Sequence, residues 1–224
     1  MKNLKNHLLK YKYRYILGLI FLILILGPSF YKILDRTRIK RTKPIEYIIV
    51  HYTANPYESA NAKLNAKYLQ KKESAGTHYC VDDTEIVQCT EENYVAYGIG
   101  DRYWRGFNPK FWLLNGQGKR KVLNHNSLQF EMCLGPTRND SIVIEKTAQQ
   151  IGWQLVNKGL DISRVLRHYD VTGKRCPYFN YKLDKNGRID INGWNQQKED
   201  ESWRLFLIKV EKYQKLHLER KQKK

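Results

Sequence analysis

Residues 45–51 read Ile-Glu-Tyr-Ile-Ile-Val-His, a run that is apolar or β-branched at almost every position. Strands that are covered on both faces of a sheet have this composition. The run ends on His51, and residues 52–55 continue as Tyr-Thr-Ala-Asn. We therefore predict a central strand that carries a histidine to one edge of a sheet, where a rigid framework can hold side chains beside a cleft.

The rest of the chain predicts helices and strands in the order of an α/β domain. A helix over 60–72 is followed by two short strands that form a hairpin, a further strand, a second helix and a last strand. These later elements are predicted over residues 77–81, 85–89, 127–134, 144–157 and 162–167. Residues 98–123 have no clear period and are expected to form a long surface loop that lines a groove. The order predicts one α/β domain with a central mixed sheet flanked by helices.

Polar and apolar residues alternate along the strand predicted over 127–134. Its even-numbered residues are apolar and face one side of the sheet, whereas Gln129, Glu131 and Cys133 face the other. Glu131 is therefore expected to be a carboxylate in the middle of a sheet. Taken alone, it is better explained as a solvent-facing strand residue.

A second histidine and a cysteine follow the last predicted strand. His168 lies at the end of that strand and Cys176 comes eight residues later, with Gly173 between them to allow a sharp turn. Two neutral imidazoles and one thiolate suit Zn²⁺, and three protein ligands leave its fourth position open to water. Each residue alone has a structural explanation as a hydrogen-bonded histidine or a core thiol. Together with His51 they predict a catalytic zinc site.

Four segments of the chain resemble the type 2 class of zinc-dependent N-acetylmuramoyl-L-alanine amidases, which includes phage endolysins and shares its fold with peptidoglycan recognition proteins. They occur in the order of that family and span about residues 45–180. The segments are 48–55 (IIVHYTAN), 77–83 (THYCVDD), 124–131 (NHNSLQFE) and 167–174 (RHYDVTGK) with Cys176-Pro177.

The resemblance implies a set of roles at the matching positions. His51, His168 and Cys176 are implied as zinc ligands, with cysteine as third ligand where other branches use aspartate. Glu131 is implied near the activated water, and Lys174 beside the scissile carbonyl. Substrate contacts are expected at the remaining motif positions and in the groove wall, at Thr53, Ala54, Tyr97 and Asn126.

Two positions depart from the family pattern. Relatives place a groove-lining histidine after the pair that corresponds to residues 96–97, where this chain has Gly98. Some branches place a catalytic tyrosine near position 77, where this chain has Thr77 followed by His78. Glu131 is therefore the first candidate for the catalytic base and His78 the second.

The expected reaction is amide hydrolysis in peptidoglycan, between N-acetylmuramic acid and L-alanine. Zinc lowers the pKa of water from about 15.7 towards 7 and polarises a carbonyl oxygen. Glu131 would take the water proton and later give it to the leaving amine. Lys174 would stabilise the oxyanion, a contribution worth roughly 2.7–4 kcal/mol for one donor. An inactive peptidoglycan sensor of the same fold is the alternative.

The net charge of +18 is concentrated at the two ends of the chain. Residues 1–44 hold eleven Lys and Arg against one acid, and residues 207–224 hold seven against two. The middle of the chain, residues 45–206, therefore carries only +3. Nucleic-acid binding depends on a basic surface of the folded part, so we expect no nucleic-acid partner.

The N-terminal region predicts a membrane segment. A basic stretch, 1–14, precedes an apolar run, and residues 15–31 reach about 17 residues, the lower limit for a spanning helix. We predict an uncleaved signal anchor over 15–31 and a basic linker over 32–44, with a cleaved signal peptide as the alternative. Because peptidoglycan lies outside the cytoplasmic membrane, we expect the domain at 45–206 to face the envelope. The chain is expected to be monomeric.

Two further patterns keep a structural interpretation beside a functional one. Cys80, Cys89 and Cys133 suit either a disulfide in an oxidising compartment or core thiols. Residues 184–190 resemble a calcium loop, but Asn186-Gly187 suits a hairpin turn better. The chain is expected to end in an amphipathic helix, with a basic tail over 207–224 that includes its last turns.

Overall fold

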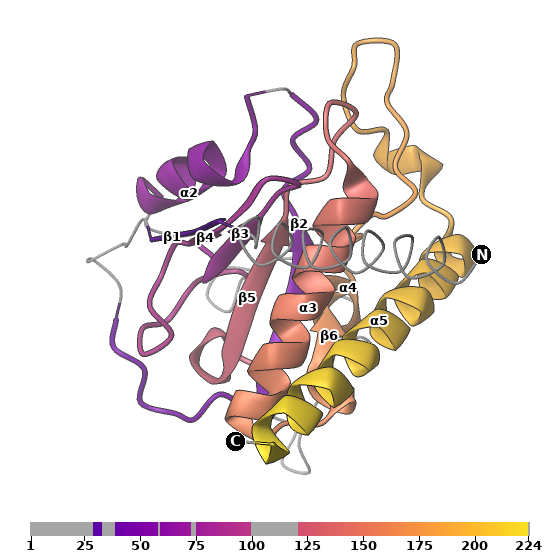
Figure 1. Ribbon diagram of the computed structural model, residues 1–224. Coiled ribbons are helices and arrows are strands. Elements are labelled where there is room, and N and C mark those ends of the chain that lie inside the picture. The colour runs from indigo at the N-terminus through magenta and orange to yellow at the C-terminus, as the bar shows by residue number, and fades with distance from the viewer. Residues whose placement is uncertain (1–28, 33–38, 58, 73–74, 100–120, 224) are drawn as a thin grey trace, which may run out of the picture.

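The computed structural model describes residues 29–32, 39–57, 59–72, 75–99 and 121–223. Figure 1 shows a sheet with helices on both of its faces. The strands are β1 (Ser29–Lys32), β2 (Tyr47–Tyr52), β3 (Tyr79–Val81), β4 (Glu85–Gln88), β5 (Ser127–Met132) and β6 (Val165–Arg167). The helices are α2 (Ala62–Gln70), α3 (Asp140–Lys158), α4 (His168–Thr172) and α5 (Gln196–Gln222), with short 3₁₀ turns at Asn124–Asn126, Ile162–Arg164 and Ile191–Gly193.

The six strands form one mixed sheet in the order β1-β4-β3-β5-β2-β6. β3 and β4 pair antiparallel, as the predicted hairpin requires, and the other neighbouring strands pair in parallel. β2 lies between β5 and β6, with His51 opposite Glu131. The predicted α/β domain with a mixed central sheet is confirmed.

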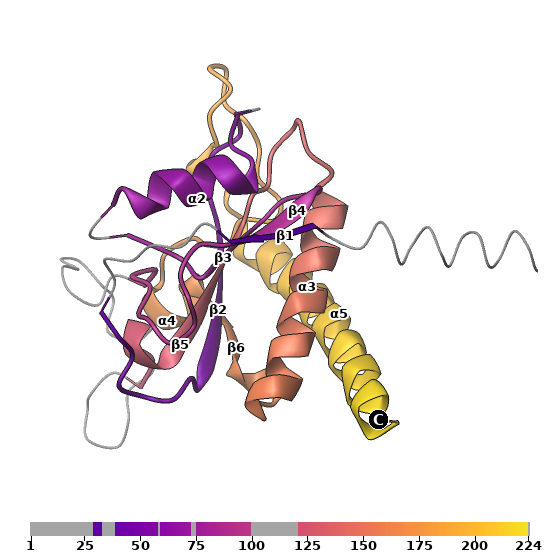
Figure 2. The same ribbon diagram turned by 60° about the vertical axis from the view of Figure 1, so that its left-hand side comes forward.

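The alternation along the central strands divides the sheet into two faces. On one face, Ile48 and Val50 of β2 pack with Phe130 of β5 against α3 and α5. Ile49 and the polar side chains of β2 and β5 point to the other face, where α2 and α4 lie. Figure 2 shows α3 and α5 on one side of the sheet and α2 and α4 on the other. His51 and Glu131 therefore lie on the face opposite the largest apolar core, whereas Cys176 packs at the edge of that core.

The helices agree with the sequence patterns but differ at their ends. The first helix is shorter than predicted because the Asn61 side chain accepts the Leu64 N–H and starts α2 at residue 62. α3 begins earlier than predicted, after the Asn139 cap, and ends at Gly159, which holds a left-handed φ of 65°. The turn at residues 184–188 is also confirmed as part of a hairpin, because Leu183 and Ile189 form an antiparallel bridge across it.

The N-terminal boundary differs from the prediction. The backbone of Ser29–Lys32 pairs in parallel with β4, so the membrane helix predicted over 15–31 is wrong at its last three residues. Residues 15–28 lie outside the described residues, as does most of the loop predicted over 98–123. Among the described residues, no helix is both long enough and apolar enough to cross a bilayer. The sheet and α5 thus extend beyond the predicted limits of 45–206.

The packing of α3 on α5 depends on Gly152. A Cβ added there would lie 2.7 Å from the Gln214 backbone nitrogen and 2.8 Å from the Tyr213 Cβ. Replacing glycine by alanine in an exposed helix stabilises it by about 1 kcal/mol. We predict instead that Gly152→Ala destabilises the protein by about 1–3 kcal/mol, because α5 must move away.

Thermal and denaturant unfolding of the full chain would measure this effect. Asn157→Ala, at an exposed position of the same helix, is the control and should leave stability unchanged or slightly raised. A Gly152→Ala variant as stable as the parent would contradict the close contact between α3 and α5.

Candidate metal centre

Two histidines and one cysteine meet at the end of the central strands. His51 Nδ1 lies 3.0 Å from His168 Nδ1, and Cys176 Sγ lies 3.8 Å from His51 Nδ1. One ligand atom from each residue lies within 4.8 Å of the other two, and all three residues are buried. The structure thus brings together the three residues that the sequence predicts as metal ligands.

Strand register and a tight turn produce this cluster. Ile48 to Val50 of β2 pair with Val165 to Arg167 of β6, so the next residues along, His51 and His168, lie side by side. α4 then ends at Gly173, whose φ of 76° reverses the chain. The Tyr169 N–H donates to the Cys176 carbonyl at 2.9 Å, which closes the turn and returns the thiol to the two imidazoles.

The three donors fit a tetrahedral zinc ion. Zn–N and Zn–S bonds of about 2.0–2.1 and 2.3 Å give N···N edges of about 3.3 Å and N···S edges of about 3.6 Å. Two of the edges, 3.0 and 3.8 Å, lie within a few tenths of an ångström of these values, and the third, between His168 and Cys176, is no longer than 4.8 Å. Three ligands from the protein leave one position for water or substrate, as catalytic zinc sites do.

Burial keeps the cluster neutral when no metal is bound. It lowers the pKa of His51 to about 3 and moves the pKa of His168 well below its usual range, and the nearby Lys174 charge adds to both effects. Burial, with the nearby Glu131, raises the pKa of the Cys176 thiol to about 12. Both imidazoles therefore have a lone pair available near neutral pH, whereas the thiol must lose a proton to bind a metal.

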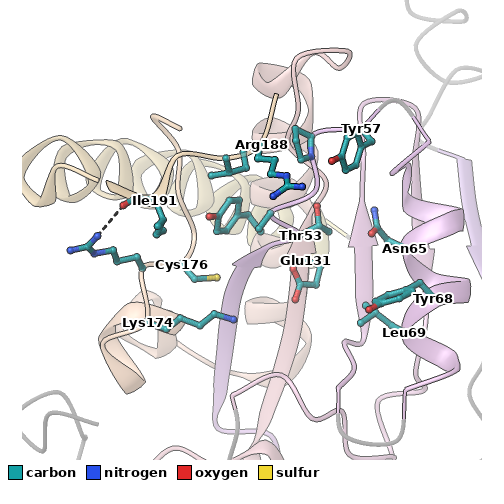
Figure 3. Close-up of a pocket in the computed structure, with 15 residues that line it drawn as sticks. Thr53, Tyr57, Asn65, Tyr68, Leu69, Glu131, Lys174, Cys176, Arg188 and Ile191 are labelled. Carbon is teal, nitrogen blue, oxygen red and sulfur yellow. Dashed lines mark hydrogen bonds between the residues drawn. The ribbon is translucent and has the colours of Figure 1, made fainter. Parts of the chain in front are cut away.

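A groove of about 740 Å³ opens beside the cluster. Figure 3 shows Lys174, Cys176 and Glu131 converging on it, with Thr53 and Arg188 above them. Of the predicted residues, the groove is lined by Thr53, Ala54, Glu131, Lys174 and Cys176. Ala54 holds a left-handed φ of 51°, a strained conformation that is frequent at functional sites.

Glu131 combines burial with access to the groove. Its Oε2 atom is buried and has no hydrogen-bond partner among the described residues. Burial raises the pKa of Glu131 to about 7, although the Lys174 charge opposes the shift. A carboxyl group with this pKa can both accept and donate a proton near neutral pH.

Besides His51 and His168, which belong to the cluster but do not line the groove, three predicted site residues lie away from it. His78 is fully buried, its Nδ1 accepts the Gln129 N–H at 3.0 Å, and its Nε2 lies 3.1 Å from the Tyr94 carbonyl. Because both ring nitrogens are bonded inside the protein, His78 is not placed to act as a base.

Asn126 and Tyr97 also lie elsewhere. The Asn126 amide donates to Glu46 Oε2 at 2.7 Å, and its oxygen accepts the Leu123 N–H. Both ends of this side chain therefore hold the start of β5, at the opposite end of the strand from Glu131. Tyr97 is half-buried, and it does not line the groove.

The structure also adds groove residues that the sequence did not identify. Arg188 and Ile189 come from the hairpin at 183–189, and Tyr68 and Leu69 come from α2. Tyr68 and Leu69 lie within the helix predicted over 60–72, but no sequence signal marked them as groove residues. Nothing in the sequence tied the hairpin to the groove.

Residues 41–179, more than half of the chain, match the family described as N-acetylmuramoyl-L-alanine amidase. The chain belongs to this family. The matched range contains the three clustered ligands, Glu131 and Lys174, and it ends before the hairpin.

Curated relatives of this amidase-family chain come from Bacillus. The N-acetylmuramoyl-L-alanine amidase CwlA of Bacillus subtilis is 32% identical over 136 residues, which cover 59% of this chain and 43% of CwlA. XlyB of the same organism is 31% identical over 151 residues, which cover 65% of this chain and 40% of XlyB. The chain thus spans less than half the length of these two relatives.

Solved structures agree on the fold. A mutant endolysin from Bacillus subtilis has a TM-score of 0.59 at 21% identity, covering 82% of this chain and 99% of its own. The catalytic domain of XlyA has a TM-score of 0.58 at 22% identity, covering 81% of this chain and 99% of its own. The fold of this amidase-family chain is therefore that of endolysin catalytic domains.

Zinc binding by this amidase-family chain should release a proton from Cys176. Because the thiol pKa is about 12 and both imidazoles are neutral well below pH 8, only the thiol carries a proton that a metal must displace. In Cys176→Asp, the carboxylate is already ionised at pH 8. We predict that this variant releases one proton fewer per zinc than the parent, and that its affinity rises less steeply with pH.

Calorimetry at pH 8 in buffers of different ionisation enthalpy measures the number of protons released. Cys80→Ala, which removes a buried thiol outside the ligand set, should match the parent. Equal release from the parent and Cys176→Asp would exclude Cys176 as a ligand.

Proposed function

We propose that this chain is a zinc-dependent N-acetylmuramoyl-L-alanine amidase that hydrolyses the amide between N-acetylmuramic acid and L-alanine in peptidoglycan. The observation that carries the proposal is the convergence of His51, His168 and Cys176 beside a groove that also exposes Glu131 and Lys174. Membership of the amidase family supports the same reaction. We propose a monomer as the active unit.

The residues divide the chemistry between them. Zinc, when bound, supplies Lewis-acid chemistry that polarises a carbonyl oxygen and lowers the pKa of water. Glu131 accepts a proton from the attacking water and delivers it to the departing amine of L-alanine. Lys174 reaches the groove from the turn after α4 and stabilises negative charge on the carbonyl oxygen. Thr53, whose Oγ1 is buried without a partner among the described residues, is available to bind substrate.

Glu131→Gln tests the enzyme against the sensor alternative. The substitution keeps the shape of the side chain but removes its ability to accept a proton. We predict a loss of about 10²–10⁴-fold in turnover, with zinc content and peptidoglycan binding retained. Glu211→Gln, on the exposed face of α5, should behave as the parent.

Release of new L-alanine amino termini from purified peptidoglycan, followed by mass spectrometry, measures the reaction. Binding by the zinc-loaded parent without any release would favour the sensor. Unchanged turnover in Glu131→Gln would remove Glu131 from the mechanism.

We also propose that the segment before β1 holds the protein at the outer side of the cytoplasmic membrane. The sequence has an apolar run that ends before Ser29, after a basic start. The run before β1, residues 15–28, is shorter than the roughly 17 residues at the lower limit for a spanning helix, a mismatch that a locally thinned bilayer can accommodate. Cleavage between Ser29 and Lys32 would cut β1, which disfavours a signal-peptidase site within that strand.

Cell fractionation tests this location. We predict that the intact chain remains with membranes after an alkaline wash, and that external protease digests it in spheroplasts. A soluble chain that begins near Ser29 would indicate signal cleavage instead of anchoring. Protection from external protease would contradict the proposed orientation.

A further inference from the structure

Gln129 contacts the metal-site histidine from within the sheet. It lies on β5, its side chain is fully buried, and its Oε1 atom lies 2.7 Å from His51 Nε2. An amide oxygen only accepts hydrogen bonds, so His51 Nε2 must carry the hydrogen in this contact. The lone pair of a neutral His51 is then on Nδ1, the atom that faces His168 and Cys176.

Ser127 fixes which way the Gln129 amide points. The Ser127 hydroxyl donates to the Leu123 carbonyl at 2.6 Å, and its oxygen accepts from Gln129 Nε2 at 2.7 Å. A flipped amide would put two acceptors, Gln129 Oε1 and the Ser127 oxygen, together at Ser127, and two donors together at a His51 Nε2 that carries its hydrogen. The chain of hydrogen bonds therefore has one consistent direction, from His51 through Gln129 and Ser127 to the backbone.

Gly98 provides the space for this amide. A Cβ added at Gly98 would lie 2.6 Å from Gln129 Oε1 and 3.1 Å from His51 Nε2. The backbone cannot easily retreat, because Asn124 Oδ1 accepts the N–H groups of Gly98 and Ile99, both at 3.1 Å. A side chain at position 98 and the Gln129 amide therefore cannot both occupy this space.

His168 has no equivalent support among the described residues. Its Nε2 atom is buried without a hydrogen-bond partner there. The orientation of the imidazole pair therefore depends on the bond between Gln129 and His51.

We propose that Gln129 is a positioning residue for the metal centre: its amide, directed by Ser127 and accommodated by Gly98, holds His51 with Nδ1 free to bind zinc. The proposal rests on the zinc site of the proposed function but not on the amidase reaction. Groups that orient a metal-bound histidine typically change metal affinity 10–100-fold when they are removed.

The central test is zinc affinity of the full-length protein, measured by competition with a chromophoric chelator. Gln129→Leu, which keeps the side-chain volume but removes the acceptor, should weaken zinc binding 10–100-fold. Gln129→Glu, which keeps an acceptor toward His51, should lose much less zinc affinity than Gln129→Leu. Gln154→Leu is the matched control. Gln154, in α3, is also fully buried, but its amide donates to Tyr79 and Glu92 and not to a metal-site residue. Zinc affinity should therefore not change in this variant.

A second readout does not involve metal. Nitrogen NMR of metal-free protein distinguishes an imidazole protonated on Nε2 from one protonated on Nδ1. The parent should show His51 with its hydrogen on Nε2, and Gln129→Leu should lose this preference. Parent-like zinc affinity together with an unchanged tautomer in Gln129→Leu would overturn the proposal, whether or not the protein hydrolyses peptidoglycan.

A double-substitution cycle tests the role of Gly98 and covers the case in which Gln129→Leu fails to fold. Gly98→Ala alone should weaken zinc binding, because the added methyl group displaces the amide. In the Gln129→Ala background the same change should have little further effect, because the short side chain leaves space. If the fold-losses in zinc affinity of Gly98→Ala and Gln129→Ala multiply in the double variant, residue 98 and the Gln129 amide do not compete for the same space. Parent-like zinc affinity in both single variants would refute the positioning role of Gln129.

Discussion

The parallel pairing of β2 with β5 on one side and β6 on the other is the constraint on which the site depends. It sets His51 opposite Glu131 and next to His168, although these residues are far apart in the chain. Side chains alternate strictly along a strand, so a shift of one residue would turn these groups into the apolar core. Packing of the core against α3 and α5 therefore fixes the strand register, and with it the positions of His51 and Glu131 on the opposite face.

Buried polar groups in this protein fall into two kinds. Glu199 is buried but accepts the N–H groups of Phe179 and Asn180, and its carboxylate anchors that loop to α5. Glu131 and His168 instead each keep a buried polar atom without a partner among the described residues, beside the groove. Leaving such an atom unpaired costs about 1–3 kcal/mol, and at Glu131, which lines the groove, this indicates a carboxyl group held ready for a ligand.

The sequence predicted the central strand, the mixed sheet and the ligand trio because each depends on local signals: a buried apolar run, strict alternation, and histidines at strand ends. It could not separate groove residues from framework residues of the same type. His78 and Asn126 lie in family motifs, yet their side chains bond to backbone and neighbouring groups inside the protein. The contact of Gln129 with His51 was equally invisible, because it depends on the missing side chain of Gly98 on another segment.

Chemistry and groove shape come from different parts of the chain. The range that matches the amidase family, 41–179, holds the ligands, Glu131 and Lys174, whereas Arg188 and Ile189 line the groove from the hairpin beyond it. A hairpin fixed at its base by the bridge between Leu183 and Ile189 can vary in its exposed residues without disturbing the sheet. The proposed hydrolysis requires groups held to within fractions of an ångström, which the strand ends provide for His51 and Glu131 and the closed turn after α4 provides for Cys176. Differences in substrate selection among such chains are therefore expected in the hairpin, while the strand ends keep the reaction the same.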